Sequence, residues 1–211
     1  MNEDLVNAMG NLDEETVLGI VKRLRDEGAG NISIMYILNR GMLQVGKNFE
    51  AGVYYLADLI VSGAIYRQAL ELLGFDCSES SNPSAGKVLI GVVKNDIHDI
   101  GKDIIVSTLK SDGFEVIDLG VDVPLEDFIA AIIKHKPDIL ALGGTMSFAL
   151  DEMQRVILEL ERVSLRGNMR VIVGGVCVNK SNAKRIGADY YSEDPIEALE
   201  ICKKMMEKQL R

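Results

Sequence analysis

The spacing of apolar residues changes from a helical to a strand-like pattern after about residue 77. Before that point apolar residues recur every three or four positions, which predicts amphipathic helices over 13–27, from 31 to about 42, and over 54–73. Asp13 and Asn31 stand at the expected N-caps of the first two helices. The inner stripe of the third helix is expected to comprise Leu56, Leu59, Ile60, Gly63, Ala64 and Leu70. Residues 1–77 are therefore predicted to form a small helical bundle.

After residue 86, short apolar runs alternate with longer amphipathic segments. The apolar runs cover 87–93, 114–118, 137–142, 169–173 and 188–191. The amphipathic segments lie near 102–112, 125–135, 149–163, 178–186 and 195–208. Runs of this length suit buried strands, and strands that alternate with helices predict a parallel sheet covered by helices on both faces. This part of the chain is therefore predicted to be an α/β domain.

Residues 78–86 separate the two patterns. Their sequence, SESSNPSAG, is polar and rich in small residues, and it breaks every periodic pattern. We interpret this segment as a linker. The expected organisation is a helical domain over 1–77, a linker over 78–86 and an α/β domain over 87–211.

Composition and charge argue against several classes of protein. With 211 residues, of which 47% are hydrophobic and 26% charged, the chain is long enough to bury a core. The net charge of −9 argues against a nucleic-acid partner, because nucleic-acid surfaces need clustered Lys and Arg. The N-terminus lacks the basic and apolar segments of a signal peptide, and no apolar run approaches the ~20 residues that span a bilayer. We expect a cytoplasmic protein without a membrane partner.

The most informative motif is Asp96-x-His98-x-x-Gly101, which follows the first apolar run. Asp96 can accept a hydrogen bond from one ring nitrogen of His98, which raises the basicity of the other nitrogen and makes it a good metal ligand. One histidine cannot hold a bare ion, and the three cysteines are too far apart in the sequence to suggest a zinc site. A metal should therefore arrive with its own equatorial ligands. The alternative is that His98 is an ordinary loop residue.

A wider pattern surrounds this motif. Gly101 is followed by 41 residues to Gly143, and Thr145 by 28 residues to Gly174-Gly175. With these spacings the chain resembles the cobalamin-binding, methyl-carrying corrinoid proteins of methyltransferase systems, and it is similar to the cobalamin-binding module of methionine synthase. The family has Ser-x-Leu where residues 143–145 of this chain are Gly-Gly-Thr. The hydroxyl that the family offers to the nucleotide tail of the cofactor is therefore missing from its usual place.

The resemblance implies a flavodoxin-like (Rossmann-type) five-stranded parallel sheet that holds cobalamin or a related corrinoid outside the carboxyl ends of its strands. It implies that His98 is the cobalt ligand and that Asp96 takes up or releases the proton that accompanies detachment and attachment of His98. These two residues are the expected catalytic pair. The further cofactor contacts that it implies in this domain are Asp99, Ile100, Gly101, Gly143, Thr145, Gly174 and Gly175. The alternative for each glycine pair is a simple turn.

Residues 41–56 resemble the helical cap that covers the reactive face of the cofactor in this family. The resemblance places Phe49 and Leu56 over the upper face of the corrin ring, where apolar residues would shield it from water and oxidants. The alternative is that both side chains belong to the core of the helical bundle, as apolar residues at helical spacing usually do.

The activity implied by the resemblance is that of a methyl carrier. Cobalt(I) of the bound corrinoid would accept a methyl group from a substrate:corrinoid methyltransferase, and a methylcorrinoid:acceptor methyltransferase would pass it to a folate or a thiol. A reductive activase is a further expected partner. The chain would then be a non-catalytic carrier component of a cobalamin-dependent methyltransferase. The alternatives are a cobalamin-dependent sensor or regulator and a corrinoid storage protein, whereas a mutase subunit would need a large substrate barrel.

Overall fold

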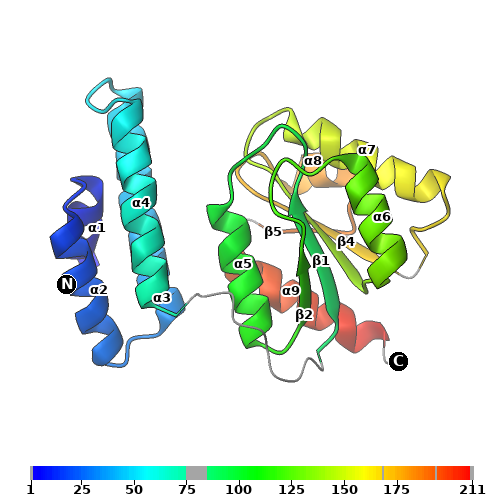
Figure 1. The fold of residues 1–211 in the computed structure, drawn as a ribbon, viewed down its shortest axis with the longest axis horizontal. Coiled ribbons are helices and arrows are strands. Elements are labelled where there is room, and N and C mark those ends of the chain that lie inside the picture. The colour runs from blue at the N-terminus through cyan, green and yellow to red at the C-terminus, as the bar shows by residue number, and fades with distance from the viewer. Residues whose placement is uncertain (1, 75–84, 168, 193, 210–211) are drawn as a thin grey trace. The chain divides into compact units, whose positions relative to one another are not determined.

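The computed structural model describes residues 2–74, 85–167, 169–192 and 194–209. The chain forms two compact units, Met1–Asp76 and Cys77–Arg211, drawn as ribbons in Figure 1. The expected linker over 78–86 lies outside the described residues except for its last two positions. Within the described ranges, no helix is both long and apolar enough to cross a membrane.

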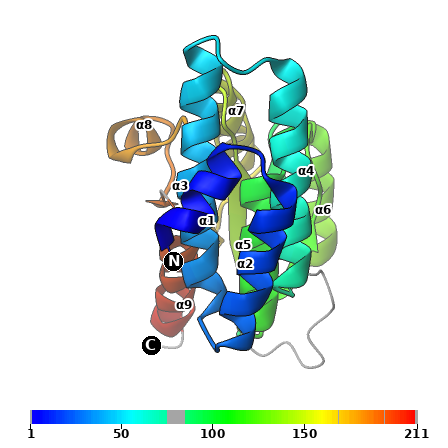
Figure 2. The same cartoon turned by 90° about the vertical axis from the view of Figure 1, so that its left-hand side faces the viewer.

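The described part of the N-terminal unit consists of α1 (Asn2–Gly10), α2 (Glu14–Asp26), α3 (Asn31–Glu50) and α4 (Leu56–Leu72). The first two helices lie on one side of the α3–α4 pair, as Figures 1 and 2 show. Gly41 lets α1 and α3 approach closely, because a Cβ at this position would lie 2.4 Å from the Cβ of Met9. The buried core includes Leu5, Met9, Val21, Ile34, Leu38, Ile65 and Tyr66.

The helix ends of this unit agree only in part with the sequence prediction. Asp13 is the N-cap of α2, and its Oδ1 accepts a hydrogen bond from Thr16 N at 3.1 Å. The assignment of Asn31 as an N-cap was wrong, because Gly30 occupies that position and the Asn31 side chain donates to Leu73 O at 2.7 Å. The nine residues of α1 are too few to show a clear period, and the sequence pattern does not predict this helix.

The buried face of α4 also differs from the prediction. Leu56 and Ile60 are each 68% exposed, whereas the buried residues are Ser62, Ile65, Tyr66, Ala69 and Leu70. Apolar residues occur nearly all round this helix, so their spacing could not indicate which side packs against the bundle.

The C-terminal unit contains a five-stranded parallel sheet in the order β2-β1-β3-β4-β5. Its strands are β1 (Lys87–Val92), β2 (Glu115–Asp118), β3 (Ile139–Gly143), β4 (Arg170–Gly174) and β5 (Tyr190–Ser192). Its described helices are α5 (Ile100–Ser111), α6 (Leu125–His135), α7 (Ala149–Arg162), α8 (Lys180–Arg185) and α9 (Pro195–Gln209). This is the flavodoxin-like strand order, so the predicted fold class is confirmed.

Helices cover both faces of the sheet. Figure 1 shows α6 and α7 on one face and α5 and α9 on the other. Alternate residues of β1 point to opposite faces: Leu89 belongs to the core with α6, α7 and α8, while Val88 and Ile90 belong to the core with α5 and α9. Because β1 lies between β2 and β3, the winding of the chain reverses beside β1, and its carboxyl end is the switch point of the sheet.

Candidate functional site

The loops that follow β1, β3 and β4 meet at the carboxyl edge of the sheet. Val93 N donates a hydrogen bond to Gly143 O at 3.1 Å, and Gly144 N donates to Gly174 O at the same distance. These bonds continue the parallel ladder beyond the strand ends. The structure therefore brings together the three segments that contain the candidate residues: 96–101, 143–145 and 174–175.

Asp96 joins two of these loops and is 1% exposed. Its Oδ1 accepts hydrogen bonds from His98 Nδ1 at 2.6 Å and from His98 N at 3.2 Å. Its Oδ2 accepts from Thr145 N at 2.6 Å and from Met146 N at 3.0 Å. Burial alone would raise the pKa of Asp96, but these hydrogen bonds together outweigh burial and lower the pKa to about 2. Asp96 is therefore a fixed anion between the loops after β1 and β3.

His98 reaches outward from this carboxylate. Its side chain is 53% exposed, in contrast to the buried Asp96 side chain. When Nδ1–H is donated to Asp96, the lone pair of the ring resides on Nε2. The arrangement thus fixes the tautomer of His98 and leaves Nε2 as the atom that can bind a metal.

The residues that follow His98 begin the next helix. Asp99 is the N-cap residue of α5, and its carbonyl oxygen accepts from Asp103 N at 2.8 Å. Ile100 is the first residue of the helix and is half-buried. Around Gly101 there is open space, since an added Cβ would have no neighbour within 4 Å. These three positions form the short connection between the His98 loop and α5.

The glycines near the strand ends differ in how much space there is for a side chain. Gly175 has φ +116°, and a Cβ there would lie 2.0 Å from Gly144 O. A Cβ at Gly144 would lie 2.4 Å from the Cβ of Ala149. Both residues are thus required by contacts within the protein, whether or not a ligand is bound. At Gly143 and Gly174 an added Cβ would meet its nearest neighbours at 3.3 Å, which is tight but leaves more room.

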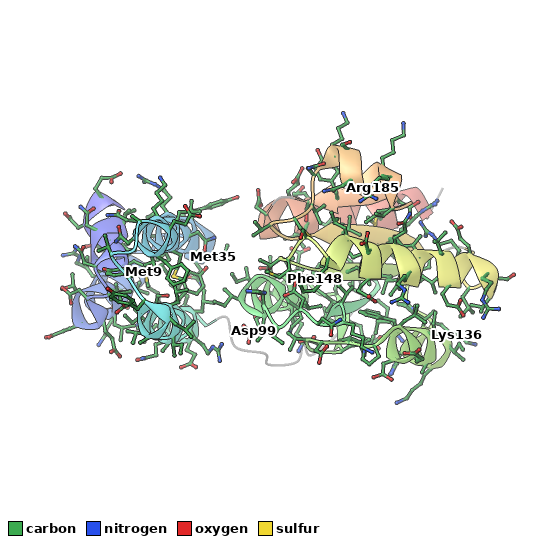
Figure 3. All side chains as sticks on the ribbon, turned by 90° about the horizontal axis from the view of Figure 1, so that it is seen from above. Met9, Met35, Asp99, Lys136, Phe148 and Arg185 are labelled. Carbon is green, nitrogen blue, oxygen red and sulfur yellow. The ribbon has the colours of Figure 1, made fainter. Side chains whose placement is uncertain are left out.

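The three loops also expose apolar side chains, which we call the apolar rim: Ile97, Met146, Phe148 and Val176. Ile97 is 71% exposed and Val176 85% exposed. Phe148 is labelled among the side chains of the C-terminal unit in Figure 3. Large apolar side chains gathered on one exposed edge commonly mark a binding surface. A rim of this kind suits an organic ligand with a large apolar surface.

An ion pair beside this site was not found by sequence reasoning. Lys102 in α5 has a side chain that is 5% exposed, and its Nζ bonds Asp103 Oδ1 at 2.6 Å and Asp118 Oδ2 at 2.5 Å. Burial alone would lower the pKa of Lys102, but the hydrogen bonds to the two carboxylates raise it. Because Asp118 ends β2, the pair ties the start of α5 to that strand. Nothing in the sequence signals that Lys102 points inward.

The two residues expected over the corrin ring lie in the N-terminal unit. Phe49, near the end of α3, is 42% exposed, and Leu56 begins α4. They are not core residues of the helical unit, so that alternative is wrong. The most exposed of the other apolar side chains of α3, α4 and their connection are Leu43, Val53, Tyr55 and Ile60. We call these six side chains the α3–α4 apolar surface.

The described residues contain no group of three or more His, Cys, Asp or Glu side chains that could hold a metal ion. His98 therefore stands as a single protein donor. A single imidazole with a fixed tautomer, beside an apolar rim, fits a metal that is already bound in a macrocycle. The donor set thus fits the cobalt of a corrinoid.

Comparisons with known proteins agree with this fit. Two matches to B12 binding domains cover residues 86–200 and residues 1–73. Dimethylamine corrinoid protein 3 of Methanosarcina acetivorans is 33% identical over 203 residues, which cover 96% of this chain and 95% of the relative. The monomethylamine corrinoid protein of Methanosarcina barkeri has a similar structure, with a TM-score of 0.86, 28% identity and 95% coverage of both chains.

A further solved structure is the methanol:cobalamin methyltransferase complex of Methanosarcina barkeri. It matches with a TM-score of 0.52 and 26% identity, over 97% of this chain and 78% of the matched chain. The two domain matches together account for nearly the whole chain. This protein therefore belongs to the family of corrinoid proteins with B12-binding domains, and its cofactor is cobalamin or a related corrinoid.

Proposed function

We propose that this protein carries methyl groups on its corrinoid as one component of a methyltransferase system. The observation that carries the proposal is the His98–Asp96 pair, whose Nε2 is directed outward at the switch point of the sheet. The names of the relatives support it, since they describe methylamine corrinoid proteins and a methanol:cobalamin methyltransferase complex. The bound corrinoid would supply the cobalt that accepts and releases the methyl group.

His98 would hold the cobalt of the corrinoid through Nε2. Asp96 accepts the Nδ1 proton of His98, which makes Nε2 a stronger donor. Because the pKa of Asp96 is lowered to about 2, the carboxylate stays ionised near neutral pH. The hydrogen-bonded Asp96–His98 pair would take up the proton that accompanies detachment of His98 from cobalt and release it on attachment.

The apolar rim and the glycine-containing loops would support the corrin ring and its tail. Ile97, Met146, Phe148 and Val176 provide apolar contact area on the edge where His98 lies. Asp99, Ile100 and Gly101 lead from His98 into α5 and would contact the same ligand. Gly143, Thr145, Gly174 and Gly175 would form the wall beside the nucleotide tail. Without a hydroxyl at 143, this wall would hold the tail mainly by its shape and through Thr145.

The α3–α4 apolar surface would shield the reactive face of the cofactor. The exposure of Phe49 and Leu56 supports this role, because their side chains are available for contact with a ligand. An apolar cover excludes water and oxidants from a nucleophilic metal centre. The helical unit would thus act as the cap of the carrier.

Two methyltransferases would use the carrier in turn. The first, a substrate:corrinoid methyltransferase, would load the methyl group, and the second would transfer it to a folate or thiol acceptor. A reductive activase would restore the cofactor after accidental oxidation. Methylated amines are the first donors to assay, because two relatives are named for dimethylamine and trimethylamine. A storage protein would bind the cofactor in the same way but would transfer no methyl group.

The proposal is tested first by the visible spectrum of the protein reconstituted with hydroxocobalamin. His98→Ala should lose the spectrum of imidazole-bound cobalt and bind more weakly. His135→Ala is the matched control, since His135 is the other histidine and ends α6, away from the strand-end loops. If His98→Ala keeps the wild-type spectrum, the ligand assignment is wrong.

A second experiment tests methyl transfer. The reconstituted and reduced protein is mixed with a methylamine:corrinoid methyltransferase and isotopically labelled methylamine, and the label on the protein-bound corrinoid is measured. Label should appear on the wild type and then leave it when an acceptor methyltransferase and its thiol are added. Stable corrinoid binding without either transfer, tested across methylamine and methanol systems, would favour storage or sensing.

A further inference from the structure

The loop that carries His98 is held from two sides. On the side of β3, Thr145 N and Met146 N donate to Asp96 Oδ2. On the side of β2, the contacts come from the loop over 119–124, which precedes α6. Residues 118–124 also resemble the family, but the spacing pattern built on Asp96-x-His98-x-x-Gly101 and the downstream glycines gives this second side no role.

Asp122 makes the contacts on the β2 side. Its Oδ1 accepts a hydrogen bond from Asn95 N at 2.7 Å. Its own backbone N donates to Asp96 O at 2.9 Å. Asp122 is therefore hydrogen-bonded to Asn95 through its side chain and to Asp96 through its backbone.

These bonds join two unusual turns. Asn95 has φ +66° and Asp122 has φ +54°, so both lie in the left-handed region, which Asn and Asp tolerate better than most residues other than glycine. The turn at Asn95 directs the Asp96 side chain inward, while His98 two residues later stays exposed. Holding Asn95 N in place therefore preserves the direction from which Asp96 meets His98.

The backbone around Asp122 has anchors of its own. Val123 N donates to Val92 O at 3.0 Å, and Val92 N donates to Gly120 O at 3.0 Å. Val93 and Val123 also form a parallel bridge. Loss of the Asp122 carboxylate would thus leave the two loops paired and would release mainly the Asn95 turn.

We infer that Asp122 is a positioning residue for the cobalt ligand: it holds the Asn95–Asp96 turn so that Asp96 can orient His98. The inference rests on the proposed function, because it needs His98 to bind cobalt. Asp122 acts through Asn95 and Asp96 and is not expected to touch the metal.

The test is a double-mutant cycle on binding of hydroxocobalamin. Asp122→Gly removes the carboxylate but keeps the backbone N–H and adopts positive φ without strain. Asp122→Asn keeps an acceptor oxygen and tolerates the same backbone conformation. Each variant is made in the wild-type and the His98→Ala background, and dissociation constants and visible spectra are measured. Glu126→Gln is the control, because it removes one negative charge four residues away without removing the acceptor of Asn95 N.

Asp122→Gly should weaken binding by roughly fivefold, as expected for loss of one hydrogen bond of about 1 kcal/mol, and should reduce the imidazole-bound fraction. In the His98→Ala background the same change should alter binding by less than about twofold, because no ligand remains to be oriented. Asp122→Asn and Glu126→Gln should bind like the wild type. A general folding defect would weaken binding in both backgrounds, so the cycle separates it from positioning.

Three results would overturn the inference. Equal losses in the two backgrounds would make Asp122 a structural residue only. Wild-type binding and spectrum in Asp122→Gly would show that the turn needs no carboxylate. A wild-type protein without imidazole-bound cobalt would refute the assignment of His98 as the cobalt ligand, and with it this inference. That result is recognised before any Asp122 variant is made, and methyl transfer by the wild type still tests the carrier function separately.

Discussion

Replacement of Asp96 by Asn should alter both stability and cofactor coordination. Asn keeps the shape of the side chain but has one acceptor oxygen where Asp96 has two. If that oxygen accepts from Thr145 N and Met146 N, the amide NH2 faces His98 Nδ1. His98 must then carry its proton on Nε2, which removes the lone pair that would bind cobalt. We expect Asp96→Asn to bind corrinoid without the imidazole-bound spectrum.

The stability effect follows from the pKa of Asp96. The pKa is lowered from 3.8 to about 2 in the folded protein, and a difference of one pKa unit corresponds to ~1.4 kcal/mol, so the ionised carboxylate stabilises the fold by about 2 kcal/mol. Since the folded pKa is the lower one, this stabilisation is present above pH 4 and is lost as the pH falls from about 4 toward 2. Asp96→Asn should lack it at every pH.

The assay is urea unfolding of the apoprotein at steps between pH 6 and pH 2.5. Other carboxylates titrate in this range, so the informative quantity is the difference in unfolding free energy between the wild type and Asp96→Asn. That difference should be about 2 kcal/mol at pH 6 and should fall to about 1 kcal/mol at pH 2.5. A difference that stays constant with pH would refute the view that Asp96 is held as an anion by its hydrogen bonds.

Four further predictions concern other parts of the molecule. Lys102→Met should lower the free energy of unfolding in urea by about 1–2 kcal/mol. The loss should be smaller than for a fully buried ion pair, because Asp103 and Asp118 still reach solvent. No loss would mean that the ion pair does not stabilise the fold. Gly175→Ala should be destabilised by more than about 2 kcal/mol in the same assay, since the new Cβ would collide with Gly144 O and φ is positive at this position. Gly101→Ala is its control, because the space around Gly101 is open. Phe49→Ala should speed photolysis of the bound methylcorrinoid without changing its spectrum, whereas Leu158→Ala, an exposed apolar residue of α7, should not. Corrinoids with benzimidazole and adenine lower bases should bind with affinities within about tenfold of each other, because 143 offers no hydroxyl to the tail; a strong preference in a spectral titration would contradict this.

The sequence was sufficient to predict those parts of the fold and the site that depend on local patterns or on residues close together in the chain. Runs such as 87–93 alternate with amphipathic segments, so the α/β class follows from periodicity, and the strand order follows from the family resemblance. The Asp96–His98 hydrogen bond could be expected because the two residues are close in the chain and share a loop. The same reasoning failed for α4, which is apolar on most sides, so that only packing decides which face is buried.

Other parts of the site could not be predicted from residue types. Backbone N–H groups of Thr145 and Met146 hold Asp96, and every residue except proline has such a group. The contact between Asp122 and Asn95 joins positions 27 residues apart and depends on two left-handed turns. Lys102 lies one residue after Gly101, but its burial depends on where β2 ends.

The four N–H groups that reach Asp96 have an entropic consequence for cofactor binding. Both carboxylate oxygens accept hydrogen bonds from the loops after β1 and β3. Because these bonds are made within the protein chain, they restrict the conformations of the His98 loop and lower the entropy that this loop would lose on binding a ligand. Part of the affinity for the corrinoid would therefore come from bonds that the cofactor never touches.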